Sequence, residues 1–220
     1  MQLVIAGTDT DVGKTVVSAL VVQGLEARYW KPVQSGLAEG SDTERVRELL
    51  GLAEERVLPE AYRFQAPVSP HWAARMEGVR IRPEALALPR VEGPLVVECA
   101  GGLMVPLHLG ADGSLLQIDQ LAVWGLPVLL VARSGLGTLN HTLLSLEALR
   151  QRAIPVLGLV LNGPPHPDNP PTLEAIGGVP VLAQLPTLQP LSAEGLQDHW
   201  LASDLPTKLQ LWECAGVTGW

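Results

Sequence analysis

The sequence has few cysteines and no long apolar run. Cys99 and Cys214 lie far apart and form no Cys-x-x-Cys pair, which favours a reduced chain over a disulfide framework. No apolar run reaches the roughly 18 residues that a membrane span needs. The N-terminal residues have neither the basic segment nor the cleavage site of a secretory signal. We therefore expect a cytoplasmic protein with no membrane partner.

Positive charge is also scarce. Asp and Glu number 23 against 15 for Lys and Arg, which gives a formal net charge of −8. Such an acidic balance argues against a nucleic-acid partner, because the phosphate backbone must be met by basic residues. The lysines are Lys14, Lys31 and Lys208. An anionic substrate would have to be bound by a few well-placed cations.

What is present is typical of one globular domain. The 220 residues are 47% hydrophobic and 17% charged, and a chain of this size buries roughly 70% of its unfolded surface. Apolar runs that read as strands cover residues 3–6, 29–33, 95–97, 128–131, 156–161 and 179–183. Helical patterns cover residues 15–25, 42–50, 70–76, 115–124 and 139–152. Continuous apolar strands that alternate with helices predict an α/β fold, a parallel sheet with helices on both faces.

Two segments do not fit this alternation. The stretch 52–90 is rich in proline and reads as irregular, apart from the helix at 70–76. The proline-rich segment 164–171 is expected to be a loop rather than a domain linker, because the strand–helix pattern resumes after it. We therefore expect a single domain over residues 1–220.

The strongest motif is a glycine-containing loop between the first strand and the first helix, Gly7-Thr8-Asp9-Thr10-Asp11-Val12-Gly13-Lys14-Thr15. This context is typical of a phosphate-binding loop, whose backbone N–H groups and helix N-terminus hold phosphate oxygens. Lys14 would add a charge near the β- and γ-phosphates, and the Thr15 hydroxyl would bind Mg²⁺. The spacing departs from the common form, because five residues separate Gly7 from Gly13.

Three further charged residues are candidates, two of them near the ends of predicted strands. Lys31 closes the second strand and could face the phosphate loop, since ligands bind beyond the carboxyl ends of parallel strands. Taken alone, Lys31 is typical of an ordinary surface lysine. Glu98 ends the strand at 95–97 and is a candidate for Mg²⁺. Asp42 follows Ser41 at a helix start, where the pattern alone favours a structural role.

Other candidates are weaker. The segment Gly137–Asn140 opens a long helix and could form an anion site or a simple turn, and the pattern does not choose between them. The five histidines show no metal-ligand spacing, so a zinc site has little support.

These motifs together resemble the dethiobiotin synthetase family. GTDTDVGKT at 7–15 is similar to the family's own phosphate loop, and KPVQSG at 31–36 to its KPV-x-SG. The further matches are SD at 41–42, APVSPHWAARMEG at 66–78, VECAGGLMVPL at 97–107, LGTLNHTLLSLEALR at 136–150, Asn162-Gly163 and Gln184-Leu185-Pro186. The resemblance covers the chain to about residue 195.

The resemblance implies a reaction. The family uses MgATP and CO2 to close a ureido ring on 7,8-diaminononanoate. One amine becomes a carbamate, which attacks the γ-phosphate to give a carbamic–phosphoric anhydride and ADP. The second amine then displaces phosphate and gives dethiobiotin.

The resemblance also implies roles for individual residues. Lys14 and Lys31 would be catalytic, stabilising the carbamate and the transferring phosphoryl group. Thr15, Asp42 and Glu98 would hold Mg²⁺, which raises Asp42 above its pattern-only interpretation. Residues expected to contact ATP are Asp11, Val12, Gly13, Lys14, Thr15, Val16, Asp42, Glu98, Gly101, Asn162, Gly163, Pro186 and Leu188. Ser35 would bind the substrate.

The family is a homodimer with the substrate across the interface. The helix start at Gly137, Thr138, Leu139 and Asn140 would then bind the substrate carboxylate from the partner subunit. This implication favours the anion site over the simple turn.

Two departures and two alternatives remain. Cys99 replaces the glycine usual in V-E-G-A-G-G, and the tail at about 196–220, with Trp200, Trp212 and Trp220, matches poorly and has no assigned role. The main alternative is a deviant P-loop ATPase switch of the partition or septum-positioning kind, but its early signature lysine corresponds to Asp9 here. A cobyrinate-type amidotransferase would need a glutaminase domain for which 220 residues leave no room.

Overall fold

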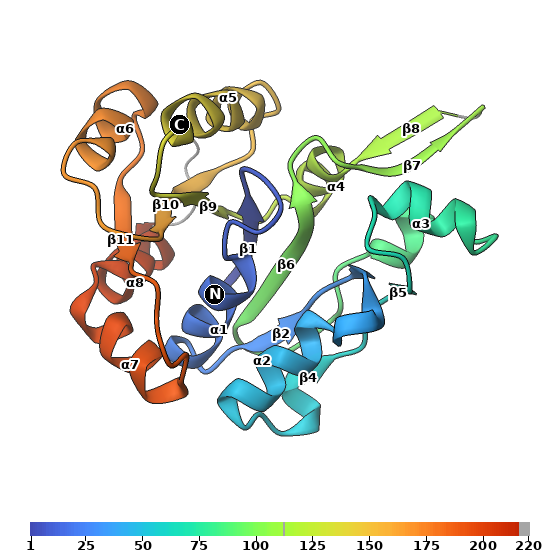
Figure 1. The fold of residues 1–220 in the computed structure, drawn as a ribbon, viewed down its shortest axis with the longest axis horizontal. Helices are drawn as coiled ribbons and strands as arrows, with labels where there is room; N and C mark the ends of the chain where they lie inside the picture. Colours follow the sequence, from blue (N-terminus) through green and yellow to red (C-terminus); the bar gives the residue numbers. More distant parts are fainter. Residues whose placement is uncertain (112, 216–220) are drawn as a thin grey trace.

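The computed structural model describes residues 1–111 and 113–215, and its centre is a seven-stranded parallel sheet. The strands run in the order β11-β10-β9-β1-β6-β2-β4. Their bounds are β1 (Gln2–Gly7), β2 (Arg28–Trp30), β4 (Val57–Leu58), β6 (Leu95–Gly102), β9 (Val128–Arg133), β10 (Val156–Asn162) and β11 (Val181–Leu185). Because β1 lies between β6 and β9, the phosphate loop that follows β1 sits at the middle of the sheet's carboxyl edge (Figure 1).

Helices cover both faces of this sheet. One face packs against α1 (Lys14–Gly24), α2 (Asp42–Leu50), α7 (Ala193–Ala202) and α8 (Leu205–Ala215). The other packs against α4 (Gln117–Trp124), α5 (Thr138–Arg150) and α6 (Asn169–Gly177). Alternate residues of β1 point to opposite faces of the sheet. Leu3 and Ile5 pack in the apolar cluster under α1, and Val4 and Ala6 pack in the cluster under α4 and α5. The predicted α/β fold is confirmed.

A smaller lobe lies beside the β2–β4 edge of the sheet. It holds a two-stranded parallel sheet of β3 (Val33–Ser35) and β5 (Tyr62–Phe64) and the helix α3 (Pro70–Met76). An antiparallel hairpin, β7 (Pro106–Gly110) and β8 (Gly113–Leu116), projects from the body above α3 (Figure 1). Three short 3-10 helices, η1 (Leu37–Glu39), η2 (Glu54–Arg56) and η3 (Pro83–Leu86), connect these elements. Because β3 follows β2 directly, this lobe borders the sheet's carboxyl edge.

Three sequence predictions were wrong in their bounds. The expected strand at 29–33 is split, because Pro32 has no N–H to donate and the chain leaves the large sheet there to pair β3 with β5. The expected helix at 115–124 begins at Gln117, since the residues before it form β8. The expected loop at 164–171 already enters α6 at Asn169, with proline in the first turn.

The C-terminal segment, whose pattern left a packed helix or a tail open, forms two helices. In α7 the indole of Trp200 lies against Gly24 of α1, where an added Cβ would come within 2.2 Å of the ring. In α8 the half-buried Trp212 packs against the same apolar cluster, and Glu213 pairs with the N-terminal amine at 2.8 Å. Trp220 lies outside the described residues. Within residues 1–111 and 113–215, no helix is long and apolar enough to cross a membrane.

Candidate active site

The loop after β1, predicted to bind phosphate, is held closely by backbone contacts. Thr8 donates its N–H to the carbonyl of Val131 at 3.0 Å, which ties the loop to β9. Gly7 is packed so closely that an added Cβ would lie 2.9 Å from the carbonyl oxygen of Asp9. Lys14 is buried and folds back into the loop, where its Nζ donates to that same oxygen at 2.8 Å. The loop therefore encloses a cation at the N-terminus of α1.

Two residues of this loop have left-handed backbone conformations. Asp11 has φ 56° and Gly13, which precedes α1, has φ 95°. An added Cβ at Gly13 would lie 1.9 Å from Nδ2 of Asn162, so only glycine fits there. Asn162 in turn donates from Nδ2 to the carbonyl of Val12 at 3.1 Å. The end of β10 thus supports the loop directly.

Beside the loop, one buried lysine meets two carboxylates. Lys31 Nζ donates to Asp42 Oδ2 and, at 2.9 Å, to Glu98 Oε1. Thr15 donates from Oγ1 to the same Glu98 oxygen at 3.0 Å. Glu98 is fully buried and Lys31 is 5% exposed, so Lys31 is not the surface lysine that its pattern suggests. Four residues from four separate segments therefore form one polar cluster.

Each member is placed by a different element. Glu98 comes from β6, next to β1, and Lys31 from the break between β2 and β3. Asp42 opens α2, whose first turn is held by a capping box in which Ser41 and Glu44 exchange hydrogen bonds. Gln34 of β3 accepts from the Asp42 N–H at 3.1 Å. The carboxylate of Asp42 is thereby directed toward Lys31.

The charges in this cluster stabilise one another. Burial would lower the pKa of Lys31, but the charges of Glu98 and Asp42 outweigh it and raise this pKa above its ordinary value. Burial would raise the pKa of Asp42, but the charge and hydrogen bond of Lys31 lower it below its ordinary value. These two shifts favour the charged forms of Lys31 and Asp42 together.

Lys14 differs from Lys31. Burial lowers the pKa of Lys14, and the neighbouring charge of Lys31 lowers it further, against the attraction of Glu98. Within the described residues, the hydrogen bond of its Nζ goes to a neutral carbonyl rather than to a carboxylate. An anion placed beside the loop would therefore gain more from Lys14 than from the lysine that is already paired.

A cavity of about 770 Å³ joins the loop and the cluster. Of the predicted site residues, Asp11, Gly13, Lys14, Thr15, Val16, Lys31, Ser35, Asp42, Glu98 and Gly101 line it. Ser35 Oγ is buried and has no hydrogen-bond partner among the described residues. A buried hydroxyl without a partner is unusual, and one at a cavity wall is available to a ligand.

Other predicted residues lie outside this cavity. Asn162 ends β10 and Gly163 follows it. The Gly163 N–H donates to the carbonyl of Leu185 at 2.8 Å, so both residues lie beside the segment that contains Pro186 and Leu188. The helix start Gly137–Asn140 does not line the cavity of its own chain. The described structure therefore brings together the residues predicted for phosphate and magnesium, and leaves the α5 start apart from them.

The sequence did not mark Tyr29 and Arg45 as residues of this site. Tyr29 of β2 is fully buried and donates its hydroxyl to Glu98 Oε2 at 2.9 Å. Burial and the charge of Glu98 raise the pKa of Tyr29 well above its ordinary value, so it stays a donor. Arg45 lines the cavity one helical turn after Asp42. A tyrosine inside an apolar strand and an arginine on a charged helix give no pattern that marks a site.

Cys99, the departure from the family pattern, lies away from the cavity. Its side chain belongs to the apolar cluster under α4 and α5, on the opposite face of the sheet from Tyr29. Burial raises the pKa of its thiol to about 12. The replacement of glycine is therefore accommodated by the core rather than by the ligand.

The donor set fits a magnesium ion. Within the described residues, no group of three or more His, Cys, Asp or Glu gathers as a metal site. Thr15, Asp42 and Glu98 instead offer one hydroxyl and two carboxylates around Lys31. Mg²⁺ prefers such hard oxygen ligands and is commonly held by one or two carboxylates plus phosphates.

Known relatives match most of the chain. A family profile described as "AAA domain" matches residues 1–195. The "ATP-dependent dethiobiotin synthetase BioD" of Rhodopseudomonas palustris (strain BisB18) is 52% identical over 196 residues, which cover 89% of this chain and 92% of the relative. That of Rhizorhabdus wittichii is 50% identical over 204 residues, or 93% and 96% of the two chains. The chain belongs to the ATP-dependent dethiobiotin synthetase family. The family resemblance inferred from the motifs is therefore confirmed.

Solved structures of other ATPases have a similar fold. The cell division ATPase MinD of Pyrococcus furiosus has a TM-score of 0.58 at 18% identity and covers 95% of this chain and 98% of its own. A ParA family ATPase from Chlorobium tepidum has a TM-score of 0.54 at 11% identity and covers 96% and 92%. At such low identities the likeness concerns the fold alone.

Proposed function

We propose that this chain is a dethiobiotin synthetase that uses MgATP and CO2 to close the ureido ring of 7,8-diaminononanoate. The observation that carries the proposal is one cavity in which the phosphate loop, a lysine between two carboxylates and an unpartnered serine hydroxyl meet. Phosphoryl transfer between bound reactants depends on such fixed positions and charges.

ATP would bind along the loop and the sheet edge. The residues from Asp11 to Val16 and Gly101 would hold the triphosphate, with Lys14 beside the β- and γ-phosphates. Asn162 and Gly163, with Pro186 and Leu188 next to them, would hold the adenine. Since Asn162 already supports Val12, the base site and the phosphate loop would be joined by one side chain.

Magnesium would be held by Thr15, Asp42 and Glu98. When bound, it would neutralise charge on the β- and γ-phosphates. The protein's own contribution is the arrangement of these oxygens, which the capping box of α2 and the hydrogen bonds of Thr15 and Lys31 keep in place.

The reaction requires three steps. One amine of the substrate attacks CO2 and loses a proton, which gives a carbamate held by Lys31 and Ser35. A carbamate oxygen attacks the γ-phosphorus, and the bond to ADP breaks. The second amine attacks the carbamoyl carbon and loses a proton, and inorganic phosphate leaves as the ring closes. Lys14 and Lys31 would stabilise the charge that moves between these groups.

The functional unit would be a homodimer. Leu136, two residues before α5, is fully exposed and Leu144 on α5 is 62% exposed, so apolar side chains are available there for a contact between subunits. The α5 start from Gly137 to Asn140 would bind the substrate carboxylate for the partner's cavity. This arrangement fits the absence of that helix start from the cavity walls of the described chain.

Mixed variants test the dimer. Lys31→Gln would disable the cavity, and Asn140→Glu would place a repelling carboxylate at the α5 start. Each variant alone should be inactive. After the two are unfolded together and refolded at equal amounts, about a quarter of the sites should be intact, because a two-fold symmetric mixed dimer has one site free of both changes. If no activity returns although mixed dimers form, the shared site is wrong.

The activity itself is tested with purified protein. Incubation with MgATP, bicarbonate and 7,8-diaminononanoate should give ADP and phosphate in step with dethiobiotin. ATP hydrolysis without dethiobiotin would instead favour an ATPase switch of the kind represented by the fold neighbours. That alternative lacks its signature lysine here, where Asp9 supplies a backbone carbonyl to Lys14.

We also propose that residues 1–220 act as one domain in the cytoplasm. α7 and α8 pack on α1 and β11, which supports a structural role for the tail from about residue 196. Within the described residues both cysteines are free, as a reduced compartment would favour.

A further inference from the structure

Tyr29 occupies a place in the site that the family motifs do not assign. It lies on β2 opposite Val96 of β6, and both side chains belong to the cluster under α1. Because alternate residues of a strand share a face, Glu98 projects from the same face as Val96, two residues nearer the carboxyl end of β6. The buried tyrosine ring therefore runs along the sheet, and its hydroxyl ends at the buried carboxylate.

The two oxygens of Glu98 have different partners. Oε1 accepts from Thr15 at 3.0 Å and from Lys31 at 2.9 Å, which places it on the cavity side of the cluster. Oε2 accepts from Tyr29 at 2.9 Å, on the core side. A buried carboxylate oxygen with no donor is costly, so without this hydroxyl the carboxylate would turn to find other partners. Such a rotation would move Oε1 away from Thr15 and Lys31.

We propose that Tyr29 is a positioning residue that fixes the orientation of the Glu98 carboxylate, so that one oxygen stays directed at the metal and the catalytic lysine. This inference rests on the proposed function for the role of Glu98. Magnesium tolerates little departure from octahedral geometry, and hydrogen bonds to its ligands from outside the ligand set strongly affect affinity. Tyr29 would touch neither ATP nor substrate.

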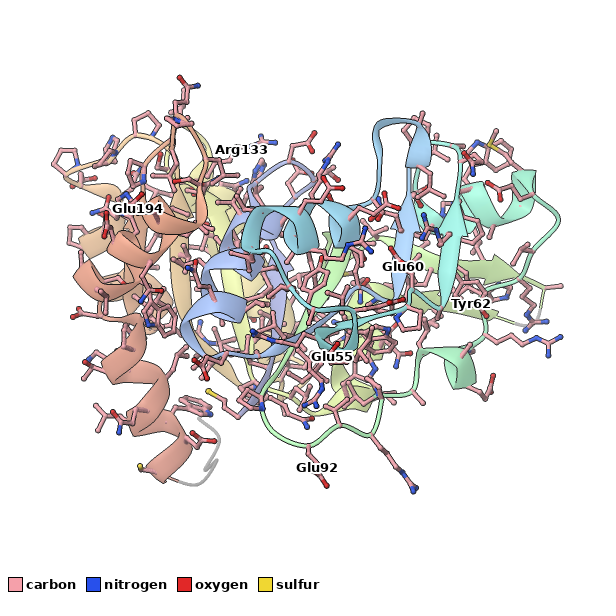
Figure 2. All side chains as sticks on the ribbon, turned by 90° about the horizontal axis from the view of Figure 1, so that it is seen from below. Glu55, Glu60, Tyr62, Glu92, Arg133 and Glu194 are labelled. Atoms are coloured by element: carbon pink, nitrogen blue, oxygen red, sulfur yellow. The ribbon has the colours of Figure 1, made fainter. Side chains whose placement is uncertain are left out.

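The sequence supplies a matched pair of variants, since it contains two tyrosines. Tyr62 lies on β5 (Figure 2), its hydroxyl accepts the N–H of Arg82 at 2.9 Å, and it is not among the residues that line the cavity. Tyr29→Phe and Tyr62→Phe each remove one hydroxyl and keep the ring. The first should weaken Mn²⁺ binding in the presence of ADP about tenfold, as measured by the free-ion electron paramagnetic resonance signal. The second should leave it within twofold of the unmodified protein.

Kinetic measurements distinguish a lost orientation of Glu98 from a general loss of structure. Tyr29→Phe should raise the magnesium concentration needed for half-maximal activity and lower kcat, while KM for the diamine changes little. In a Glu98→Gln background, adding Tyr29→Phe should have no further effect on Mn²⁺ affinity, because the carboxylate that it orients is gone. Unchanged Mn²⁺ affinity in Tyr29→Phe, or an equal loss in both backgrounds, would overturn the proposal.

A second measurement covers the case in which Tyr29→Phe does not fold. In the Tyr62→Phe protein, Tyr29 is the remaining tyrosine, so biosynthetic 3-fluorotyrosine reports on it alone. Its fluorine resonance should shift when Mg²⁺ is added with ADP, and a resonance that does not move would contradict the proposal. Since neither metal binding nor this shift requires dethiobiotin to form, the inference and the proposed function can fail separately.

Discussion

Lys31 shows how far a single residue depends on its surroundings. In the sequence it closes a short apolar run before proline, as many surface lysines do. In the structure its ammonium lies between Asp42 and Glu98 and is almost fully buried. A buried ammonium is tolerated only with such partners, because desolvation without them would be prohibitive. The lysine and the two carboxylates therefore have to be considered together.

Lys31→Gln should lower dethiobiotin formation by about a hundredfold or more, as the loss of a transition-state charge does elsewhere. The fold should persist, since glutamine can still donate to the two carboxylates. Turnover assays with circular dichroism check both expectations. Lys208→Gln, at the exposed third lysine in α8, is the matched control and should retain normal activity. Comparable rates for the two variants would remove Lys31 from the catalytic set.

The charge of Asp42 should stabilise the fold in a defined pH range. Its pKa is lowered in the folded state, so the stabilisation is present above the unfolded value near pH 4 and is lost as the pH falls through the folded pKa. The difference in free energy of unfolding between the unmodified protein and Asp42→Asn should therefore be constant from pH 5 to 7 and shrink below pH 4. Urea unfolding at pH 7, 5 and 3 measures it.

Asp198→Asn provides the control for that pH series. It removes an exposed carboxylate of α7, which changes the net charge equally without touching Lys31. If the difference in free energy of unfolding between the unmodified protein and Asp42→Asn grew toward pH 3, the assignment of an ionised carboxylate at that position would be wrong.

At the scale of elements, α2 links stability to the site. Its first residue is Asp42, and its capping box and the hydrogen bond from Gln34 set where that residue stands. A helix start defined by Ser41 and Glu44 can be read from sequence, since the capping pattern is local. That this start faces Lys31 cannot be read from sequence, because it depends on how α2 packs against α1.

Ser41→Ala should cost about 1 kcal/mol of stability, the usual worth of an N-cap. It should also raise the magnesium requirement, because the cap positions Asp42. The matched control is Ser192→Ala, which removes the N-cap of α7, where Ser192 Oγ accepts from the Gly195 N–H at 3.1 Å. The control should lose similar stability in denaturant titrations and keep its magnesium dependence. Identical magnesium dependence in both variants would mean that the cap acts on stability alone.

At the scale of the whole molecule, residues far apart in the chain enclose one core. The N-terminal strand β1 is central, and the last helices return to the same layer, where α7 packs on α1 and α8 on β11 (Figure 1). Gly24 and Trp200 approach closely, and an added Cβ at Gly24 would lie 2.2 Å from the indole ring. The tail is thus part of the layer that holds the helix of the phosphate loop.

Gly24→Ala should destabilise the protein by about 1–3 kcal/mol, because its methyl group overlaps the Trp200 ring. Gly135→Ala is the control, since an added Cβ there meets no atom within 4 Å and the backbone is not left-handed. Thermal unfolding of the two variants checks the difference. Trp200→Leu added to Gly24→Ala should recover part of the loss, and no recovery would place the cause elsewhere.

The sequence alone determined the features that depend on local pattern, which are the elements and the loop between the first strand and the first helix. Apolar runs and helical periods predicted the parallel sheet with helices on both faces, and the order Gly13-Lys14-Thr15 between strand and helix predicted the phosphate loop. Asp42 became a candidate only through the family resemblance, because acids are common at helix starts for local reasons. Tyr29 gave no signal, since an aromatic residue is ordinary in a strand.

The tertiary structure decided which of these residues meet. Lys31, Asp42 and Glu98 are separated by 11 and 56 positions in sequence, yet they form one cluster because β2, α2 and β6 converge at the same edge of the sheet. The break after Trp30, the hairpin β7–β8 and the contact of Trp200 with Gly24 likewise depend on partners distant in the chain. Such pairings carry no local pattern, because their free energy arises only when the distant segments are packed together.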